Sequence, residues 1–293
     1  MTAQLRGIIP PMTTPFDEDG NIDEVAFCED VDYLLQAGVH GLAVGGSTGE
    51  GHTLSREELV QLNKRAVLQA SGNVPVIAGI IADSTREVID RGKAVADLGV
   101  AALQITPVHY LFTPDEQAMY DYYARISDSV DLPIIIYNVI PWSYCSPRLL
   151  VRMIREIDRV IGVKQSAGDI HALAELLMLL HGDGKVLAAV DDLLYPCFAL
   201  GAHGAIAAIL TAVPKVCFHL WNAVQDGRHD EALSLHQQLF ELWLALSGPN
   251  LPARVKTAMR LQGRTSGSPR SPMPAPTESE EAKIRSALEK MKQ

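Results

Sequence analysis

Eight short apolar segments alternate with amphipathic stretches along the chain, and this alternation limits the possible folds more than any other feature. Each segment is only a few residues long and rich in β-branched residues, as is typical of strands. Nearly continuous apolar character indicates strands covered on both faces, which is the situation in a parallel sheet. The predicted strands span residues 7–12, 41–46, 74–80, 101–107, 132–138, 160–166, 185–190 and 204–209.

The stretches between these segments have the apolar spacing of helices. Several begin with recognisable start signals. Ser55 is followed three residues later by Glu58, which makes a capping box, and Thr113-Pro114 precedes Asp115. The predicted helices span residues 24–36, 56–70, 85–98, 115–127, 147–157, 170–180 and 193–200.

Eight strands that alternate with helices predict a (β/α)₈ barrel, also called a TIM barrel. A doubly wound open sheet is the alternative, but its glycine-rich first turn is missing. The segment 45–50, with the sequence GGSTGE, fits neither GxGxxG nor the lysine-bearing P-loop.

Further helices are predicted after the eighth strand, at residues 213–225, 229–245, 251–261 and 278–291. The linker 263–277 is rich in Gly, Ser and Pro and should be irregular. We therefore predict a barrel in residues 1–225 that carries the catalytic site, and a small C-terminal helical region in residues 226–293.

Composition argues against several classes of protein. The net charge is −10 and no basic stripe stands out, which disfavours nucleic-acid binding. No apolar run approaches the ~18 residues of a membrane span, and the N-terminus lacks a signal-peptide core, so a cytoplasmic protein is expected. We expect no metal, cofactor or disulfide, because histidines and cysteines show no ligand-type pairing. The scattered cysteines are Cys28, Cys145, Cys197 and Cys217.

Lys164 is the first candidate catalytic residue, because it lies in the apolar strand 160–166. A lysine is rarely buried without a partner or a chemical task. Desolvation disfavours the charged form of an amine, and a neutral amine attacks ketones to form a Schiff base. The alternative is a strand-end lysine that reaches solvent or forms an ion pair.

Functional residues of such barrels lie at the C-terminal ends of the strands. The second strand ends in Ser47-Thr48 between glycines, a turn whose amides can face a carboxylate, although ordinary turns have the same composition. The fourth is followed by His109-Tyr110, which is otherwise a surface pair. The fifth ends in Tyr137, which could simply fill the core. Together with Lys164, these ends place hydroxyls, a phenol and an amine around one barrel mouth.

The order and spacing of several motifs resemble one family across nearly the whole chain. This is the dihydrodipicolinate synthase / N-acetylneuraminate lyase family of class I, pyruvate-type aldolases. The motifs are PPMTTPF at 10–16, GSTGE at 46–50, Thr106-Pro107, Tyr137-Asn138, Gly162-Val163-Lys164 and Gly201-Ala202-His203-Gly204.

The resemblance implies a role for each candidate. Lys164 would form an imine with the ketone carbon of pyruvate or a related 2-oxo acid, which makes the protein a lyase. Tyr137 would relay protons, with Ser47 as its relay neighbour. Thr48 would hold the carboxylate of the 2-oxo acid together with Ser47.

The resemblance also has implications for the periphery of the site and for subunit assembly. Gly46 and Ile206 would complete the 2-oxo-acid pocket, and Tyr110 is a further catalytic candidate. Family members place two tyrosines after Thr-Pro, one of which reaches a neighbouring subunit. Here Val108 and His109 occupy those positions, so either His109 or Tyr110 takes the inter-subunit role. The resemblance also implies a homo-tetramer built as a dimer of dimers.

The chain departs from the lysine-biosynthesis synthases in its second-substrate region. Those enzymes place an arginine shortly after the Tyr-Asn pair to bind the aldehyde's carboxylate, whereas residues 139–145 contain no basic side chain. Val190 is expected to narrow the pocket. The aromatic residues Phe112, Trp142 and Tyr144 favour an apolar aldehyde.

Four hypotheses follow. The first is a 2-oxo-acid lyase with a sugar-acid-like, aromatic or otherwise apolar aldehyde partner. A dehydratase or aldolase of deoxy-oxo sugar acids would use the same imine. A true 4-hydroxy-tetrahydrodipicolinate synthase is the third. A non-catalytic binding protein is disfavoured, because a binder does not need Lys164 as a nucleophile.

Overall fold

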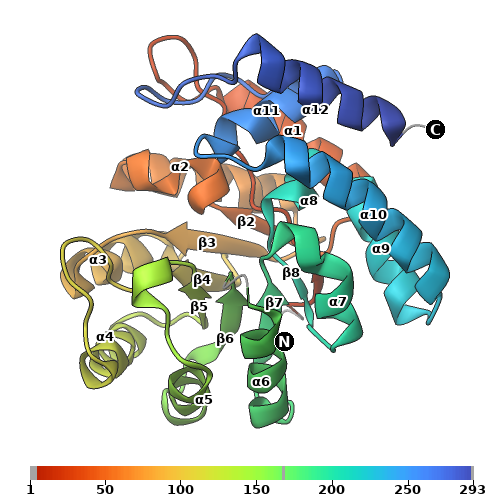
Figure 1. Ribbon diagram of the computed structural model, residues 1–293. Helices are drawn as coiled ribbons and strands as arrows, with labels where there is room; N and C mark the ends of the chain where they lie inside the picture. The colour runs from red at the N-terminus through yellow and green to blue at the C-terminus, as the bar shows by residue number, and fades with distance from the viewer. Residues whose placement is uncertain (1–4, 167–168, 292–293) are drawn as a thin grey trace.

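The computed structural model describes residues 5–166 and 169–291 and contains a curled, eight-stranded parallel sheet surrounded by helices (Figure 1). Hydrogen bonds link the strands in the order β1-β8-β7-β6-β5-β4-β3-β2. This is the predicted (β/α)₈ barrel, and the prediction is confirmed. The strands are β1 Gly7–Ile8, β2 Leu42–Val44, β3 Val76–Ile80, β4 Ala102–Ile105, β5 Ile134–Asn138, β6 Val160–Gln165, β7 Lys185–Ala188 and β8 Gly204–Ala205.

Residues just beyond β1 close the barrel. The predicted first strand ran to residue 12, but its regular part ends at Ile8, because prolines have no N–H with which to continue a ladder. The chain nevertheless stays extended. The carbonyl of Pro10 accepts a hydrogen bond from Ala43 at 3.0 Å, and Met12 donates to the Ala43 carbonyl at 2.8 Å. These bonds and a parallel bridge between Pro11 and Ala43 join the first strand to β2.

The helices agree with the predicted ranges to within about two residues, except for α8, which was not predicted. Its residues were assigned to the eighth strand, which was predicted to reach residue 209. In the structure β8 ends at Ala205 and α8 begins at Ala208. The helices are α1 Glu24–Gln36, α2 Arg56–Ala70, α3 Thr85–Ala96, α4 Glu116–Ser129, α5 Pro147–Glu156, α6 Ile170–Leu180, α7 Leu194–Ala199, α8 Ala208–Ala212, α9 Pro214–Gln225, α10 His229–Leu246, α11 Leu251–Leu261 and α12 Glu278–Lys290.

Two apolar clusters form the core. The larger lies between the strands and the surrounding helices. The smaller fills the barrel interior with one or two side chains from most strands, as expected when inward positions alternate along each strand. Its fully packed members are Leu5, Ile9, Ala43, Ile77, Ala102, Ile135, Leu187 and Ile206.

The C-terminal helices lie against one side of the barrel (Figure 1). Helix α10 packs on α9, α12 packs on α10 and α11, and α11 contacts both α8 and the turn Ser47–Gly49. The division at residue 225 stays a prediction. Within the part of the chain that the structure describes, no helix combines the length and apolarity needed to cross a bilayer.

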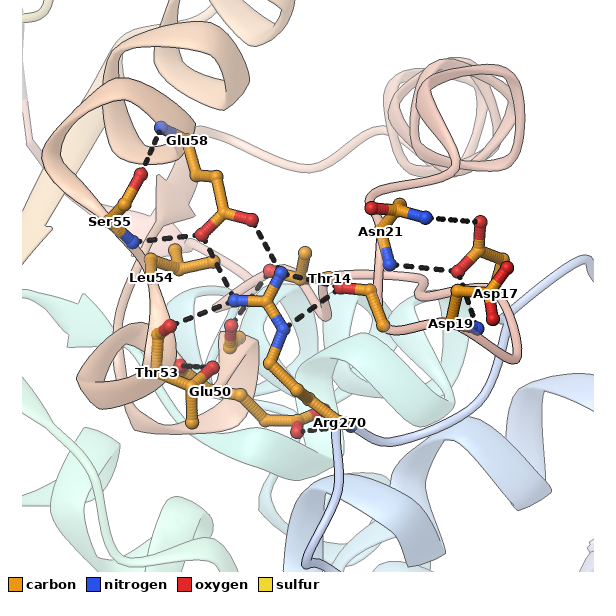
Figure 2. A network of polar contacts seen from close by, with 12 residues as sticks. Thr14, Asp17, Asp19, Asn21, Glu50, Thr53, Leu54, Ser55, Glu58 and Arg270 are labelled. Carbon is orange, nitrogen blue, oxygen red and sulfur yellow. Dashed lines mark hydrogen bonds and ion pairs between the residues drawn. The ribbon is translucent and has the colours of Figure 1, made fainter.

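The linker 263–277 is irregular, as predicted, and it is fixed to the barrel by arginine contacts. Figure 2 shows the guanidinium of Arg270 between Glu58 and the carbonyl of Thr53. Arg270 also donates to the carbonyl of Gly20 and lies 4.1 Å from the centre of the Phe16 ring. These contacts hold the linker beside the loop that follows β2.

Candidate active site

A cavity of about 290 Å³ opens at the C-terminal ends of the strands. It contains most of the predicted catalytic residues, brought together from strands that lie far apart in the sequence. C-terminal residues also contribute, because the first residues of α11 form part of the wall. The cavity is lined by Ser47, Thr48, Tyr137, Val139, Lys164, Ser166, Ala189, Asp191, Ile206, Ala207, Ala208, Leu251 and Pro252.

Lys164 is buried near the end of β6, with 3% of its surface exposed. Strand register pairs it with Tyr137 of β5, so both side chains point to the same face. The Lys164 amine lies 3.6 Å from the centre of the Tyr137 ring. It forms no ion pair with any carboxylate in residues 5–166 or 169–291. The alternatives of a solvated or salt-bridged strand-end lysine therefore do not describe this residue.

Tyr137 connects the amine to the turn after β2. Its hydroxyl donates a hydrogen bond to Oγ of Ser47 at 3.2 Å. Ser47 begins a short 3₁₀ turn, Ser47–Gly49, whose first amides have no acceptor within the turn. Thr48 is buried and lines the cavity with Ser47. An amine, a phenol and a hydroxyl-bearing turn therefore surround one small space.

Asp191 is a cavity residue that sequence reasoning did not select. It follows β7 in the short turn 191–193, and its Oδ1 accepts a hydrogen bond from the amide of Ile209 at 2.7 Å. This bond holds the start of α8, which explains why the predicted eighth strand ends early. Burial raises the pKa of Asp191 to about 7, although the Ile209 amide and the Lys164 charge act in the opposite direction. The sequence did contain a signal for this residue, because the acidic pair Asp191-Asp192 directly follows an apolar strand.

We expect Asp191→Asn to stabilise the protein, and more strongly at pH 8 than at pH 5. Because the folded-state pKa lies above the ordinary value of 3.8, the favourable contribution of the neutral carboxyl is complete below that value and is lost as the pH rises toward 7. Asparagine can accept the same amide bond without carrying charge. Thermal melting should show a gain of roughly 2–4 °C or more at pH 8 and a smaller one at pH 5. An equal gain at both pH values would contradict a raised pKa.

Of three other residues predicted at the site, the cavity wall includes Ile206 but neither Gly46 nor Val190. Ile206 lines the cavity and is fully buried in the barrel interior. Gly46 is not among the lining residues. Its carbonyl accepts bonds from the amides of Gly49 and Gly51 and so shapes the turn. Val190 does not line the cavity, so the expectation that it narrows the pocket is wrong. Its neighbours Ala189 and Asp191 face the space instead.

The loop after β4 contributes no residue to the described wall of its own chain's cavity. Asp83 Oδ1 accepts bonds from the amides of His109 and Tyr110, at 2.8 and 2.9 Å. The Tyr110 residue is 72% exposed, and Leu111 beyond it is 90% exposed. Trp142 joins this loop by donating from its indole to the His109 carbonyl at 3.0 Å. The structure therefore does not bring Tyr110 together with Lys164 within one chain.

The predicted aromatic contributors to an apolar pocket are likewise absent from the described cavity wall. Phe112, Trp142 and Tyr144 are exposed by 60%, 65% and 40%, and none lines the cavity. Apolar lining comes from Val139 and from Leu251-Pro252. Sequence reasoning missed the last two because they follow the barrel by many residues and carry no polar group.

Fold and site together define a (β/α)₈-barrel protein with a buried lysine, a tyrosine and a hydroxyl-bearing turn at its C-terminal mouth. The model of the Dihydrodipicolinate synthetase family matches residues 4–291. The chain therefore belongs to this family, and the predicted family is confirmed. Its members are lyases, so the prediction of a lyase is confirmed at the level of the class.

Individual relatives agree with this assignment. The chain is 33% identical over 294 residues to the 4-hydroxy-tetrahydrodipicolinate synthase of Methanopyrus kandleri, covering 99% of this chain and 98% of the relative. It superposes with a TM-score of 0.93 on YagE of Escherichia coli K12 in complex with pyruvate, at 28% identity and 99% coverage of both chains. The TM-score to CdNal of Clostridium difficile in complex with mannosamine is 0.90, at 26% identity, with 98% and 99% of the two chains covered.

Proposed function

We propose that the protein is a Schiff-base lyase that acts on pyruvate or a related 2-oxo acid. Lys164 Nζ attacks the ketone carbon and water leaves, which gives an iminium. A C–H bond on the adjacent carbon then breaks: its proton passes to a base, and its electron pair forms the C=C bond of an enamine as the iminium nitrogen becomes neutral. The enamine formed in this way makes a carbon–carbon bond to an aldehyde, and the reverse sequence breaks that bond. The observation that carries the proposal is the buried Lys164 amine, without an ion-pair partner in the described chain, beside Tyr137 in the cavity.

The neighbouring side chains fit the remaining tasks. Tyr137 can carry protons to and from the reacting carbon or oxygen, and Ser47 is placed to exchange protons with it at 3.2 Å. The amides at the start of the turn and the hydroxyl of Thr48 supply donors for the carboxylate of the 2-oxo acid.

Reductive trapping tests the proposal. Borohydride with pyruvate should add a stable mass to the peptide that contains Lys164, because reduction converts the imine into an amine that cannot hydrolyse. The same treatment across a panel of 2-oxo acids would rank the first substrate. An adduct on another lysine, or none with any 2-oxo acid, would refute the proposal.

The second substrate is proposed to be an aldehyde without a carboxylate beside the reacting centre. Lys164 is the only cationic side chain among the described residues that line the cavity, and Lys164 is used in the imine. Val139, Leu251 and Pro252 add apolar surface, and the acidic Asp191 would repel a second carboxylate. A carboxylate buried there would lack a partner, at a cost on the order of several kcal/mol.

We therefore expect aspartate semialdehyde to react poorly. In coupled assays with pyruvate, its kcat/KM should be at least about tenfold below that of an apolar or aromatic aldehyde. The competing candidate is a true 4-hydroxy-tetrahydrodipicolinate synthase, which the name of the Methanopyrus kandleri relative favours. Should aspartate semialdehyde prove the best partner by tenfold or more, the synthase function would stand. The missing cation would then be sought on a neighbouring subunit.

We also propose a cytoplasmic homo-tetramer built as a dimer of dimers. The loop after β4 supports an interface, because Tyr110, Leu111 and Phe112 are all exposed. Leu111 also has a φ of 74°, a left-handed conformation that is unfavourable for leucine. A second copy that covers this loop would bury the apolar side chains and bring Tyr110 or His109 to the neighbouring cavity. Light scattering at micromolar concentration should give four times the chain mass; a monomer mass would exclude the interface.

A further inference from the structure

Glu50 and Lys256 form a fully buried ion pair between the barrel and the C-terminal region. Their side chains are 0% and 2% exposed, and the Lys256 amine donates to Glu50 Oε1 at 2.6 Å. The two residues are separated by 206 positions in the sequence. Burial lowers the pKa of Lys256, while the Glu50 carboxylate acts in the opposite direction. Removing one partner of a charge pair at this depth is strongly destabilising, because it leaves an uncompensated buried charge.

Glu50 directly follows the turn that carries Ser47 and Thr48. Its backbone is left-handed, with φ 54°, and its amide donates to the Ser47 carbonyl at 3.1 Å. The second carboxylate oxygen accepts from the backbone amide of Arg270 at 2.9 Å, a contact drawn in Figure 2. The carboxylate therefore fixes the end of the turn to the linker and to α11 at once.

Lys256 is also held from several directions. Its amine donates a second bond to the Ser268 carbonyl at 2.7 Å and lies 4.8 Å from the centre of the Phe16 ring. Helix α11, which carries Lys256, begins with Leu251-Pro252 in the cavity wall. The same helix therefore supplies part of the cavity wall and, through Lys256, an ion-pair partner for the residue that follows the hydroxyl-bearing turn.

We propose that Glu50 and Lys256 are positioning residues that set the placement of Ser47 and Thr48 and thereby the affinity for the 2-oxo acid's carboxylate. Neither residue lines the cavity, so both would act through the turn. A bond from Thr14 Oγ1 to the Gly49 carbonyl, 2.7 Å long, restrains the same end of the turn. The part of the inference that concerns substrate rests on the proposed function.

The chain contains a matched control. Asp30 and Arg264 form another buried ion pair between the barrel and the C-terminal region, with side chains 3% and 5% exposed. Arg264 also donates to the carbonyls of Thr211 and Ala212, and among the described residues neither side chain of this pair hydrogen-bonds to the turn after β2. Loss of this pair should therefore lower stability without moving Ser47 or Thr48.

The experiment compares Glu50→Gln, Lys256→Met, Asp30→Asn and Arg264→Met with the unmodified chain. Hydrogen exchange of the peptide that covers residues 46–54 reports the turn, and calorimetric titration with pyruvate reports affinity, both well below each melting temperature. Glu50→Gln and Lys256→Met should each accelerate exchange in the peptide and weaken pyruvate binding by about tenfold or more. The control variants should leave both quantities within about twofold, even where they melt earlier.

A double variant separates loss of the ion pair from misfolding caused by an unpaired buried charge. Lys256→Met alone leaves an uncompensated buried carboxylate, whereas Glu50→Gln with Lys256→Met leaves no buried charge. If the pair acts as a unit, the double variant should lose no more affinity than either single variant. Unchanged exchange and affinity in Glu50→Gln and the double variant, or equal losses in the control pair, would overturn the inference. If the unmodified chain bound no 2-oxo acid, the proposed function would fall, and the exchange rates would still decide whether the pair holds the turn.

Discussion

Replacing Lys164 with alanine is expected to reduce turnover to background and to abolish trapping of any 2-oxo acid. The substitution removes the nucleophile itself, and no other amine lies among the described cavity residues. The barrel should remain folded, because Lys164 faces the cavity and makes no ion pair with a described residue. Steady-state assays, mass spectrometry after borohydride treatment and circular dichroism together measure these outcomes.

Lys185→Ala is the control for this experiment. Lys185 begins the neighbouring strand β7 and lies at the opposite, N-terminal end of the barrel. Its loss should leave turnover and trapping unchanged. Retention of a 2-oxo-acid adduct in the Lys164→Ala protein would show that the reacting amine lies elsewhere.

Tyr137→Phe is expected to lower kcat by roughly 10²–10⁴-fold, the usual contribution of a positioned acid or base. The ring, which packs beneath the Lys164 amine, is kept, so pyruvate affinity should change little. The bond to Ser47 is lost with the hydroxyl. Rapid mixing and titration with pyruvate separate the chemical step from binding. A fall in kcat of less than about threefold would assign Tyr137 to packing.

Two variants provide contrast for this result. Tyr122 is buried and donates its hydroxyl to the Thr106 carbonyl at 3.2 Å, outside the cavity, so Tyr122→Phe should leave kcat unchanged. Thr48→Val removes a hydroxyl from the proposed carboxylate site and should weaken 2-oxo-acid binding more than it slows chemistry. If Thr48→Val bound pyruvate normally, the carboxylate site would have to be placed elsewhere.

Much of the fold was predictable because its signals are local. The helix spans 24–36, 56–70, 170–180 and 251–261 agree with α1, α2, α6 and α11 in every residue. Ser55 and Glu58 form the expected capping box at the start of α2. The predicted strands were longer than the observed ones because apolar character continues past the last ladder bond, as it does at Pro10-Pro11. The hydropathy of a segment predicts whether it is buried, whereas the ends of a strand are set by which backbone amides form hydrogen bonds to a neighbouring strand.

The same contrast between local signals and tertiary contacts applies to the residues of the candidate site. Lys164 and Tyr137 were identifiable because a lysine inside an apolar strand and a tyrosine at a strand end are local anomalies. Asp191 was passed over, since an acid after a strand is ordinary until burial and the Ile209 amide give it a special environment. Nothing in the sequence marked Leu251 and Pro252 as cavity residues, because apolar residues at the start of a helix usually serve only in core packing.

The barrel, the family and the positions of an amine, a phenol and two hydroxyls at strand ends could all be predicted from the sequence. These features follow from periodicity and from residue types, which act over a few neighbouring positions. Two features could be recognised only in the folded chain: α11 completes the cavity wall, and Lys256 forms an ion pair with Glu50 behind the turn. Such contacts join segments some 200 residues apart. Their strength depends on desolvation, which exists only once the chain has excluded water from both partners.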